Sequence, residues 1–224
     1  MLRRLAQLFG RVKHILRTEG LLSLLRQGFA FLAGCIFRYE TYYLHEIRLE
    51  GGSEADFMPR IQDFTLKVVS TNQQADELVT DGFKFRYSDG IRRERLDKGT
   101  IAFCIFIGEE LAHIGWLAMN EEAQKSIVSF PFQVDFPNKE VFIGGVWTNP
   151  KYRGKGLHTY GLFKRLQFLK ERGTTVSRGA VDTRNVASQR VNAKFGCNYY
   201  AEARYLKLLW WESWEEKALT QRNP

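Results

Sequence analysis

The feature that most limits the folds open to this chain is a strand followed by a basic, glycine-rich turn and a helix. The stretch Val146–Leu157 begins as a strand, stops at Pro150 and turns through Arg-Gly-Lys-Gly at 153–156. Helical spacing then continues to about Glu171. Backbone N–H groups at a helix start and in a glycine turn are unpaired and converge on one concavity. The stretch therefore predicts an α/β fold with a phosphate or pyrophosphate site at this turn.

Two common phosphate-binding motifs do not fit the turn. A P-loop requires G-x-x-x-x-G-K-[ST], and a dinucleotide fold requires G-x-G-x-x-G after its first strand. The sequence Arg153-Gly154-Lys155-Gly156-Leu157-His158 instead resembles the R-x-x-G-x-[G/A] signature of the GNAT superfamily of acyl-CoA-dependent N-acyltransferases. His158 stands where that signature has a small residue.

A second motif follows at the separation and in the order that this superfamily has. Asn185 and Ser188 match its N-x-x-[A/S] pattern, and a short helix then ends at Phe195-Gly196. Asn185 or Asp182 is suited to cap that helix, and Gly196 is suited to end it. The resemblance covers roughly residues 64–211.

The resemblance implies a mixed α/β fold, with a mainly antiparallel twisted sheet and helices on both faces. We expect residues 64–224 to form this acyltransferase domain, residues 51–63 to be a linker and residues 1–50 to be a basic helical extension. Within the domain, the sequence patterns predict strands at 64–70, 101–107, 111–119 and 175–181 besides the motif strand, and helices at 71–80, 88–98, 156–171 and 185–195. Residues 124–139 are expected to form a loop.

The resemblance also implies acetyl-CoA, or another acyl-CoA, as cosubstrate. In this superfamily the motif strand splays from its neighbour and leaves backbone groups unpaired. The predicted contacts to the pantetheine arm and the thioester carbonyl are Val146, Trp147 and Thr148. The predicted pyrophosphate contacts are Arg153, Gly154, Lys155, Gly156, Leu157 and His158, and the second motif adds Asn185 and Ser188.

Direct transfer requires a neutral amine to attack the thioester, so a base must remove a proton from an ammonium group. Glu140 is the first candidate, because it opens the motif strand where the histone-acetylating branch carries a glutamate base; an ordinary strand-end carboxylate is the alternative. His113 is the second candidate, against a buried core histidine, and Glu110 and Asp182 could also reach the cleft. The family tyrosine that protonates the thiolate is replaced by Asn192, so Tyr199, with Tyr200 and Tyr205 as alternatives, is the predicted acid. The other alternative is that the thiolate leaves unassisted, since its conjugate thiol is already fairly acidic.

The net charge of +8 is concentrated near the N-terminus. Residues 1–38 carry seven basic side chains and one acid, Glu19, which gives +6. Leucines at helical spacing lie opposite the basic residues and predict two helices, one up to about Glu19 and one from Gly20 to Tyr39. These helices are suited to lie on an anionic membrane surface or to pack on the domain or on a second copy of the chain, as in a homodimer. No segment is long and apolar enough for a spanning helix, and nucleic acid is not an expected partner.

The three cysteines and four histidines are scattered without metal-ligand spacing, so no metal is expected. Reduced cysteines favour the cytoplasm, or the inner face of the membrane if the N-terminal helices bind lipid. The predicted function is transfer of acetyl from acetyl-CoA to a primary amine of a small molecule or amino sugar in a ternary complex. The alternatives are a longer acyl donor or an acyl-carrier protein, and a non-catalytic CoA-binding or membrane-associated interaction protein.

Overall fold

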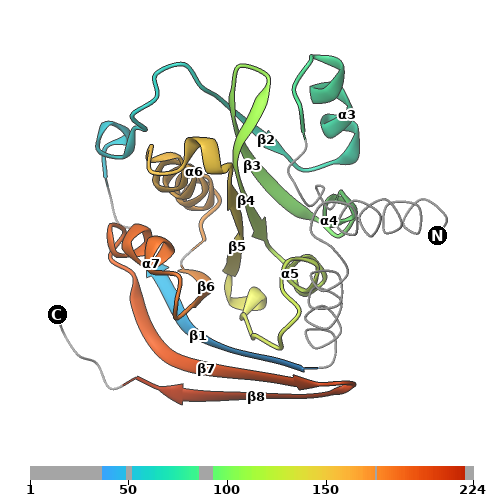
Figure 1. Cartoon of the computed structure of the whole chain (residues 1–224), viewed down its shortest axis with the longest axis vertical. Coiled ribbons are helices and arrows are strands. Elements are labelled where there is room, and N and C mark those ends of the chain that lie inside the picture. Colours follow the sequence, from blue (N-terminus) through green and yellow to red (C-terminus); the bar gives the residue numbers. More distant parts are fainter. Residues whose placement is uncertain (1–36, 49–51, 86–92, 175, 220–224) are drawn as a thin grey trace, which may run out of the picture. The chain divides into compact units, whose positions relative to one another are not determined.

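A computed structural model describes residues 37–48, 52–85, 93–174 and 176–219 of the chain. Its eight strands form one sheet in the order β2-β3-β4-β5-β6-β1-β7-β8 (Figure 1). The strands are β1 Phe37–Arg48, β2 Thr65–Val69, β3 Thr100–Ile107, β4 Glu110–Ala118, β5 Glu140–Thr148, β6 Val176–Asp182, β7 Asn198–Leu208 and β8 Trp211–Ala218. The described helices are α3 Asn72–Thr80, α4 Glu94–Asp97, α5 Glu121–Ile127, α6 Leu157–Glu171 and α7 Val186–Ala193, with 3-10 turns η1 Glu54–Phe57, η2 Phe136–Asn138 and η3 Pro150–Tyr152.

The chain divides into two compact units, and the features discussed below lie in the larger one. The larger unit contains residues 42–203 and 216–224, and the smaller one contains residues 1–41 and 204–215. Within the larger unit β5 and β6 run parallel, whereas β1 with β6, β2 with β3, β3 with β4 and β4 with β5 are antiparallel. The prediction of a mixed, mainly antiparallel sheet is confirmed.

Helices cover both faces of this sheet, as the sequence predicts. Leu78 of α3 and Leu96 of α4 pack with one set of strand residues that includes Cys104. Leu162 and Leu169 of α6 pack with the set on the opposite face, where Phe103 lies next to Cys104 in sequence. Successive strand side chains point to opposite faces, so the continuous apolar run in β3 serves two cores.

Polar side chains fix where the helices begin. The Thr71 hydroxyl accepts a hydrogen bond from the Gln74 amide at the start of α3, and the Asn120 side chain accepts one from the Ala123 amide at the start of α5. Each bond satisfies a backbone donor that the first helical turn leaves free. A local signal of this kind predicts α3 almost to the residue.

The predicted helix over Gly20 to Tyr39, and with it the helical extension up to residue 50, is wrong from residue 37 onward. Residues 37–48 form β1, and Tyr42–Arg48 pairs with β6. Leu44 and Ile47 are fully buried. Burial against β6 and the α6 face overrides the weak helical pattern, because tertiary packing decides between helix and strand for short apolar runs. The remaining residues of the predicted extension, 1–36, 49 and 50, lie outside the described ranges.

Three further expectations need correction. Residues 124–127 are helical because α5, capped by Asn120, ends only at Ile127. Of the helix predicted over residues 88–98, the structure has α4 at 94–97, and 86–92 lie outside the description. The predicted linker is packed, because the ring of Phe57 stacks on Phe163 at 4.9 Å and on Phe195 at 4.7 Å. Across the described residues, no helix has the length and apolar character needed to cross a membrane.

Candidate active site

The two parallel strands at the centre of the sheet separate after a short paired segment. β5 pairs with β6 only over Glu140–Phe142, and from Ile143 onward it is paired only with β4 on its other side. A bulge lies in β5 opposite Ile114–Trp116, where Gly145 has a φ of 58°. A Cβ on Gly145 would lie 2.9 Å from Trp116, so only glycine fits there. We call the resulting gap the β5–β6 opening; it leaves one side of β5 without sheet partners.

The glycine turn lies at the end of β5 and leads directly into α6. Gly154 and Gly156 have φ values of 73° and 87°, a conformation that favours glycine. Gly156 begins α6 without a side-chain cap, so the first N–H groups of a 15-residue helix receive no side-chain acceptor there. The turn therefore presents backbone donors and the positive end of a helix dipole, as an anion site requires.

A cavity of about 690 Å³, the turn cavity, lies against this turn. All of the predicted CoA contacts line it except Trp147 and Lys155. Residues Asp56–Met58 and Arg60, from the segment expected to be a linker, form another part of its wall. The Asn185 side chain, which accepts a hydrogen bond from the Ser188 amide at 3.1 Å, sets the start of α7 beside it. The structure thus brings both sequence motifs to one cavity.

The lining of the turn cavity is strongly basic. Four cationic side chains line it, from Arg60, Arg153, Arg190 and Lys194, against the single acid Asp56. The guanidinium of Arg153 donates from Nε to the Thr148 carbonyl at 3.2 Å, which holds it over the end of β5. Clustered positive charge in a concave site raises the local concentration of a polyanionic ligand.

A second cavity of about 150 Å³, the floor cavity, lies in the β5–β6 opening. Its polar lining comes from four elements and includes His45 of β1, Arg165 and His158 of α6, Asp182 of β6, and Asn185, Ser188 and Asn192 of α7. Asn185, Ser188, His158 and Val146 also line the turn cavity, so the two cavities share a wall. A ligand held at the turn can therefore extend along β5 toward the floor.

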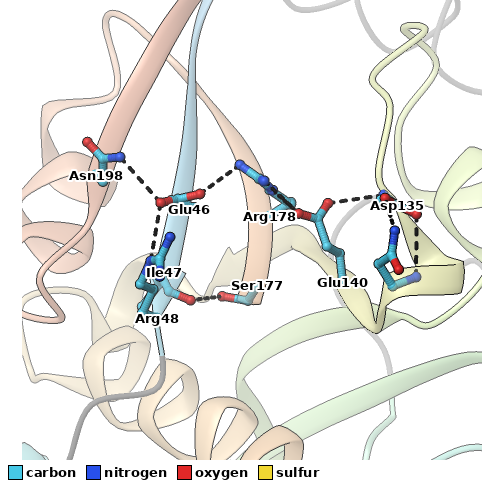
Figure 2. Close-up of polar contacts among 9 residues, drawn as sticks. Glu46, Ile47, Arg48, Asp135, Glu140, Ser177, Arg178 and Asn198 are labelled. Atoms are coloured by element: carbon cyan, nitrogen blue, oxygen red, sulfur yellow. Dashed lines mark hydrogen bonds and ion pairs between the residues drawn. The ribbon is translucent and has the colours of Figure 1, made fainter. Parts of the chain in front are cut away.

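The carboxylate of Glu140 lies at the closed end of the opening and lines neither cavity. Figure 2 shows it bound to Arg178, whose NH2 donates to Glu140 Oε1 at 2.5 Å and whose NH1 donates to Glu46 at 2.8 Å. The amide of Asp135 also donates to it, at 3.0 Å. Burial would raise the pKa of Glu140, but these hydrogen bonds hold it below its ordinary value. The arrangement is that of an ion-paired group joining β1, β6 and β5.

The other two predicted catalytic residues are also absent from the linings of the two cavities. His113 is fully buried, with Nδ1 2.8 Å from the Thr148 hydroxyl and Nε2 packed against Gly161. Its pKa is lowered well below the ordinary value, first by burial and then by His158 and Arg165. Tyr199 has a buried hydroxyl, and burial raises its pKa. The structure does not bring Glu140, His113 and Tyr199 together.

Of the alternatives that the sequence left open, Asp182 reaches the site. It lines the floor cavity and receives three hydrogen bonds from Arg184, of 2.7 to 3.0 Å. These bonds lower its pKa, so it is ionised at neutral pH. Glu110 instead binds Lys151, Tyr152 and Asn149, and it lines neither cavity.

His158, the departure from the glycine-rich signature, turns its ring under the helix. The ring stacks on His113 with centroids 5.6 Å apart, and burial lowers its pKa to about 3. Its side chain therefore leaves the turn toward the α6–β4 interface. Within the described ranges, no group of three or more His, Cys, Asp or Glu side chains is placed to hold a metal.

Sequence reasoning missed two buried residues of the floor cavity, His45 and Arg165. The signal for His45 was the alternation of aromatic and charged residues over Phe37-Arg38-Tyr39-Glu40, which is typical of a strand. The signal for Arg165 was a lone charge between Leu162, Leu166 and Leu169 on the buried face of α6. Both signals were present in the sequence but needed the strand partner to be interpreted.

The chain is similar to one protein family and to several solved structures. Residues 71–197 match the model of the acetyltransferase (GNAT) family. No curated protein matches the chain significantly. Similar solved structures include a putative GNAT acetyltransferase from Novosphingobium aromaticivorans (15% identity, 77% of this chain and 65% of that one, TM-score 0.46). Others are a GCN5-related N-acetyltransferase-like protein from Streptococcus suis (16%, 82% and 67%, 0.47) and a GCN5-related N-acetyltransferase from Sphaerobacter thermophilus (13%, 89% and 57%, 0.47).

This chain spans between 56% and 66% of the length of three similar solved proteins, from Drosophila, Staphylococcus epidermidis and Novosphingobium aromaticivorans.

Proposed function

Because this chain belongs to the acetyltransferase (GNAT) family, which uses an acyl-CoA cosubstrate, we propose that it transfers acetyl from acetyl-CoA to a primary amine of a small molecule such as an amino sugar. The observation that carries the proposal is the separation of β5 from β6 directly beside the glycine turn. The glycine turn is suited to bind a phosphate, and the unpaired side of β5 is suited to bind an extended ligand through backbone hydrogen bonds.

In this proposal the pyrophosphate of CoA binds at the turn from Arg153 to His158. The uncapped N–H groups of α6 and the positive-φ glycines provide backbone donors without side-chain bulk. Arg60, Arg190 and Lys194 add charge that sequence motifs did not predict. The pantetheine arm follows the unpaired side of β5 past Val146, and this places the thioester near the bulge at Gly145.

The amine of the acceptor attacks the thioester carbon directly in a ternary complex. A C–N bond forms, the C–S bond breaks, and the electron pair of that bond leaves on the CoA sulfur. The ammonium proton must be removed before attack. We assign this step to Asp182, acting directly or through a water, because its carboxylate lines the floor cavity, whereas Glu140 lines neither cavity.

The thiolate of CoA takes up a proton after it leaves. Asn192, in the family's tyrosine position, cannot supply one, and Tyr199 does not line the cavity. We propose that the thiolate leaves unassisted and is protonated by solvent, since its conjugate thiol is already fairly acidic.

The size of the floor cavity favours a short acyl group over a long one. A cavity of about 150 Å³ has the volume of roughly five waters at ~30 Å³ each. This observation favours acetyl over the long acyl chains of the alternative donors, including those on an acyl-carrier protein. Lys151, which the carrier alternative would present to an acidic partner, is paired with Glu110 at 2.9 Å.

The catalytic unit in this proposal includes Tyr42–Arg48 of β1, because this stretch pairs with β6 beside the site. Residues 1–36 carry six basic side chains and one acid, a net +5. We propose that this segment holds the enzyme at an anionic membrane surface. Packing of the segment on another copy of the chain is the alternative, and a full-length protein that does not bind anionic vesicles would favour it.

The cofactor assignment is tested by calorimetry of CoA with Gly154→Val. The valine fills the turn and should weaken CoA binding at least tenfold. Gly173→Val is the matched control, because Gly173 also has a positive φ, 68°, and likewise has no atom within 4 Å of its added Cβ, but lies at the far end of α6. Both variants carry the same backbone strain, of ~1–2 kcal/mol. Equal CoA affinity in the two folded variants would refute the site.

The reaction itself is tested by mass spectrometry of the full-length protein incubated with acetyl-CoA and a pool of small amines. We expect free CoA and a product about 42 mass units heavier than one amine, because acetyl replaces a hydrogen atom. An acetylated protein intermediate would contradict direct attack.

A further inference from the structure

The guanidinium of Arg165 is buried without an acidic partner. Its side chain belongs to a residue that is 1% exposed. Nε donates to the Gly161 carbonyl at 3.1 Å and NH1 donates to the Trp116 carbonyl at 3.5 Å. Among the described residues, no carboxylate forms an ion pair with it. Burial lowers its pKa to about 10, so it stays charged at neutral pH. Buried charges in proteins are normally paired, because an unpaired one loses its hydration without compensation.

The fold makes room for this side chain. A Cβ on Gly115 would lie 2.6 Å from Arg165 Cζ and 2.7 Å from NH1, so β4 has a glycine where the guanidinium lies. Leu162, Leu166 and Leu169 surround Arg165 on the buried face of α6. An aliphatic residue at 165 would suit that face better by burial alone. Burying an unpaired charge is unfavourable, yet β4 leaves space for this one. We therefore expect a ligand to pair with it.

His45, another residue that lines the floor cavity, also has a buried donor without a partner among the described residues. His45 of β1 is 4% exposed, and its Nε2 is 3.3 Å from the Asn192 side-chain nitrogen. With that amide donating to Nε2, the ring proton is on Nδ1, which has no hydrogen-bond partner among the described residues. Burial lowers the pKa of His45 to about 4, so the ring is neutral at neutral pH. Glycine again makes room, because a Cβ on Gly179 would lie 2.6 Å from the ring.

We propose that the floor cavity binds a carboxylate of the substrate, held by the guanidinium of Arg165. The planar fork of arginine matches the two oxygens of a carboxylate, and the small cavity admits that group with a few carbons. The acid in the same lining, Asp182, is neutralised by Arg184, so it does not occupy Arg165. This inference rests on the proposed acyl transfer and narrows its substrate class.

The carboxylate has two possible sources, and they share one chemistry. It belongs to the donor if a short dicarboxylic monothioester takes the place of acetyl-CoA, in which case the free end of the acyl group would point down β5 into the floor. It belongs to the acceptor if the amine is an amino acid. The experiment therefore has one arm for each source.

The donor arm compares two CoA thioethers of equal chain length, one ending in a carboxylate and the other in a carboxamide, by calorimetry on the full chain. The acceptor arm compares alanine with alaninamide, and β-alanine with its amide, in the presence of saturating CoA. In one of the arms we expect the carboxylate to bind at least tenfold more tightly than its neutral amide, as a charge-assisted hydrogen bond to a buried arginine gives.

The same arms are repeated with Arg165→Met and Arg165→Lys. Methionine should reduce the preference to within twofold, and lysine, which keeps the charge but not the fork, should retain part of it. Arg172→Met is the matched control, because Arg172 lies at the exposed end of the same helix, where it stacks on Phe168. It should keep the full preference.

Equal binding of carboxylate and amide in both arms by the wild-type chain would overturn the proposal without depending on any variant. A loss of binding in Arg165→Met that is the same for acid and amide would also overturn it, because that pattern assigns Arg165 to structure. If CoA binds but the carboxylate and amide ligands bind equally, the proposed function stands and only this inference fails. Failure of CoA itself to bind would overturn the proposed function and this inference together.

Discussion

Glu140→Gln separates a structural role for this carboxylate from the catalytic role that its motif position predicts. The change keeps the shape and removes the charge that Arg178 binds. Breaking a fully buried ion pair costs ~3–5 kcal/mol, and breaking an exposed one costs ~0.2–1 kcal/mol. The side chains of Glu140 and Arg178 are 15% and 22% exposed, which places the pair nearer the buried limit. Glu46 remains as a second partner of Arg178, so we expect a loss of about 2 kcal/mol.

The assay is thermal unfolding of the full chain at several pH values. At neutral pH the variant should melt ~4–8 °C lower, since 1 kcal/mol corresponds to ~2–4 °C in a chain of this size. The pKa of Glu140 is lower in the folded state than in the unfolded state, where it is ~4.3. Its stabilisation is therefore present above pH ~4.3 and is lost as the pH falls through the folded-state pKa. The difference between the two proteins should close at low pH.

Glu121→Gln is the matched control. Glu121 pairs with Lys125 one helical turn away, and both side chains are more than 70% exposed, so this variant should lose less than ~0.5 kcal/mol. The transfer rate of Glu140→Gln should stay within a few-fold of wild type. A rate lower by ~10²–10⁴-fold with unchanged melting and CoA affinity would refute the structural reasoning and assign Glu140 as the base.

Three other predictions follow from burial and from the charged N-terminus. Cys104 and Cys197 should resist a thiol reagent at pH 8 until the protein unfolds, because burial raises the pKa of both, that of Cys197 to about 12; mass spectrometry of the labelled peptides would expose any early reaction. A chain that starts at Phe37 should fold and bind CoA, whereas one that starts at Gly51 loses β1 and should aggregate; equal melting of the two would contradict this. Full-length protein should sediment with anionic vesicles at low salt and release at high salt, and the chain from Phe37 should not; indifference of both to vesicles would end the membrane proposal.

The sequence predicted the elements whose signals are local. The turn at 153–156, the start of α7 at Asn185 and the two-faced run of β3 each depend on a few neighbouring residues, and the structure has them where expected. Both motifs also met at one cavity, because a βα unit fixes where the helix start lies relative to its strand.

The catalytic candidates could not be chosen in the same way. Glu140 is suited to be a base by position, but its partner Arg178 comes from β6 and is brought to it only by the parallel pairing. Nor does the sequence predict that His45 and Arg165 line one cavity. His45 lies before the recognised domain, and Arg165 lies in the middle of α6. These roles depend on contacts between segments that are far apart in the chain, and such contacts cannot be predicted from the pattern of a single sequence.

The place of β1 in the sheet has a consequence for how the protein forms on the ribosome. Tyr42 pairs with Asp182, so β1, the first strand of the described residues, must wait until β6 has been synthesised before it finds this partner. β2, β3 and β4 pair with sequence neighbours and are able to assemble earlier. Long-range pairing of this kind slows folding and leaves an apolar strand exposed in the meantime. We therefore expect the floor of the active site to be the last part of the molecule to form, and the newborn chain to depend most on chaperones just before β6 appears.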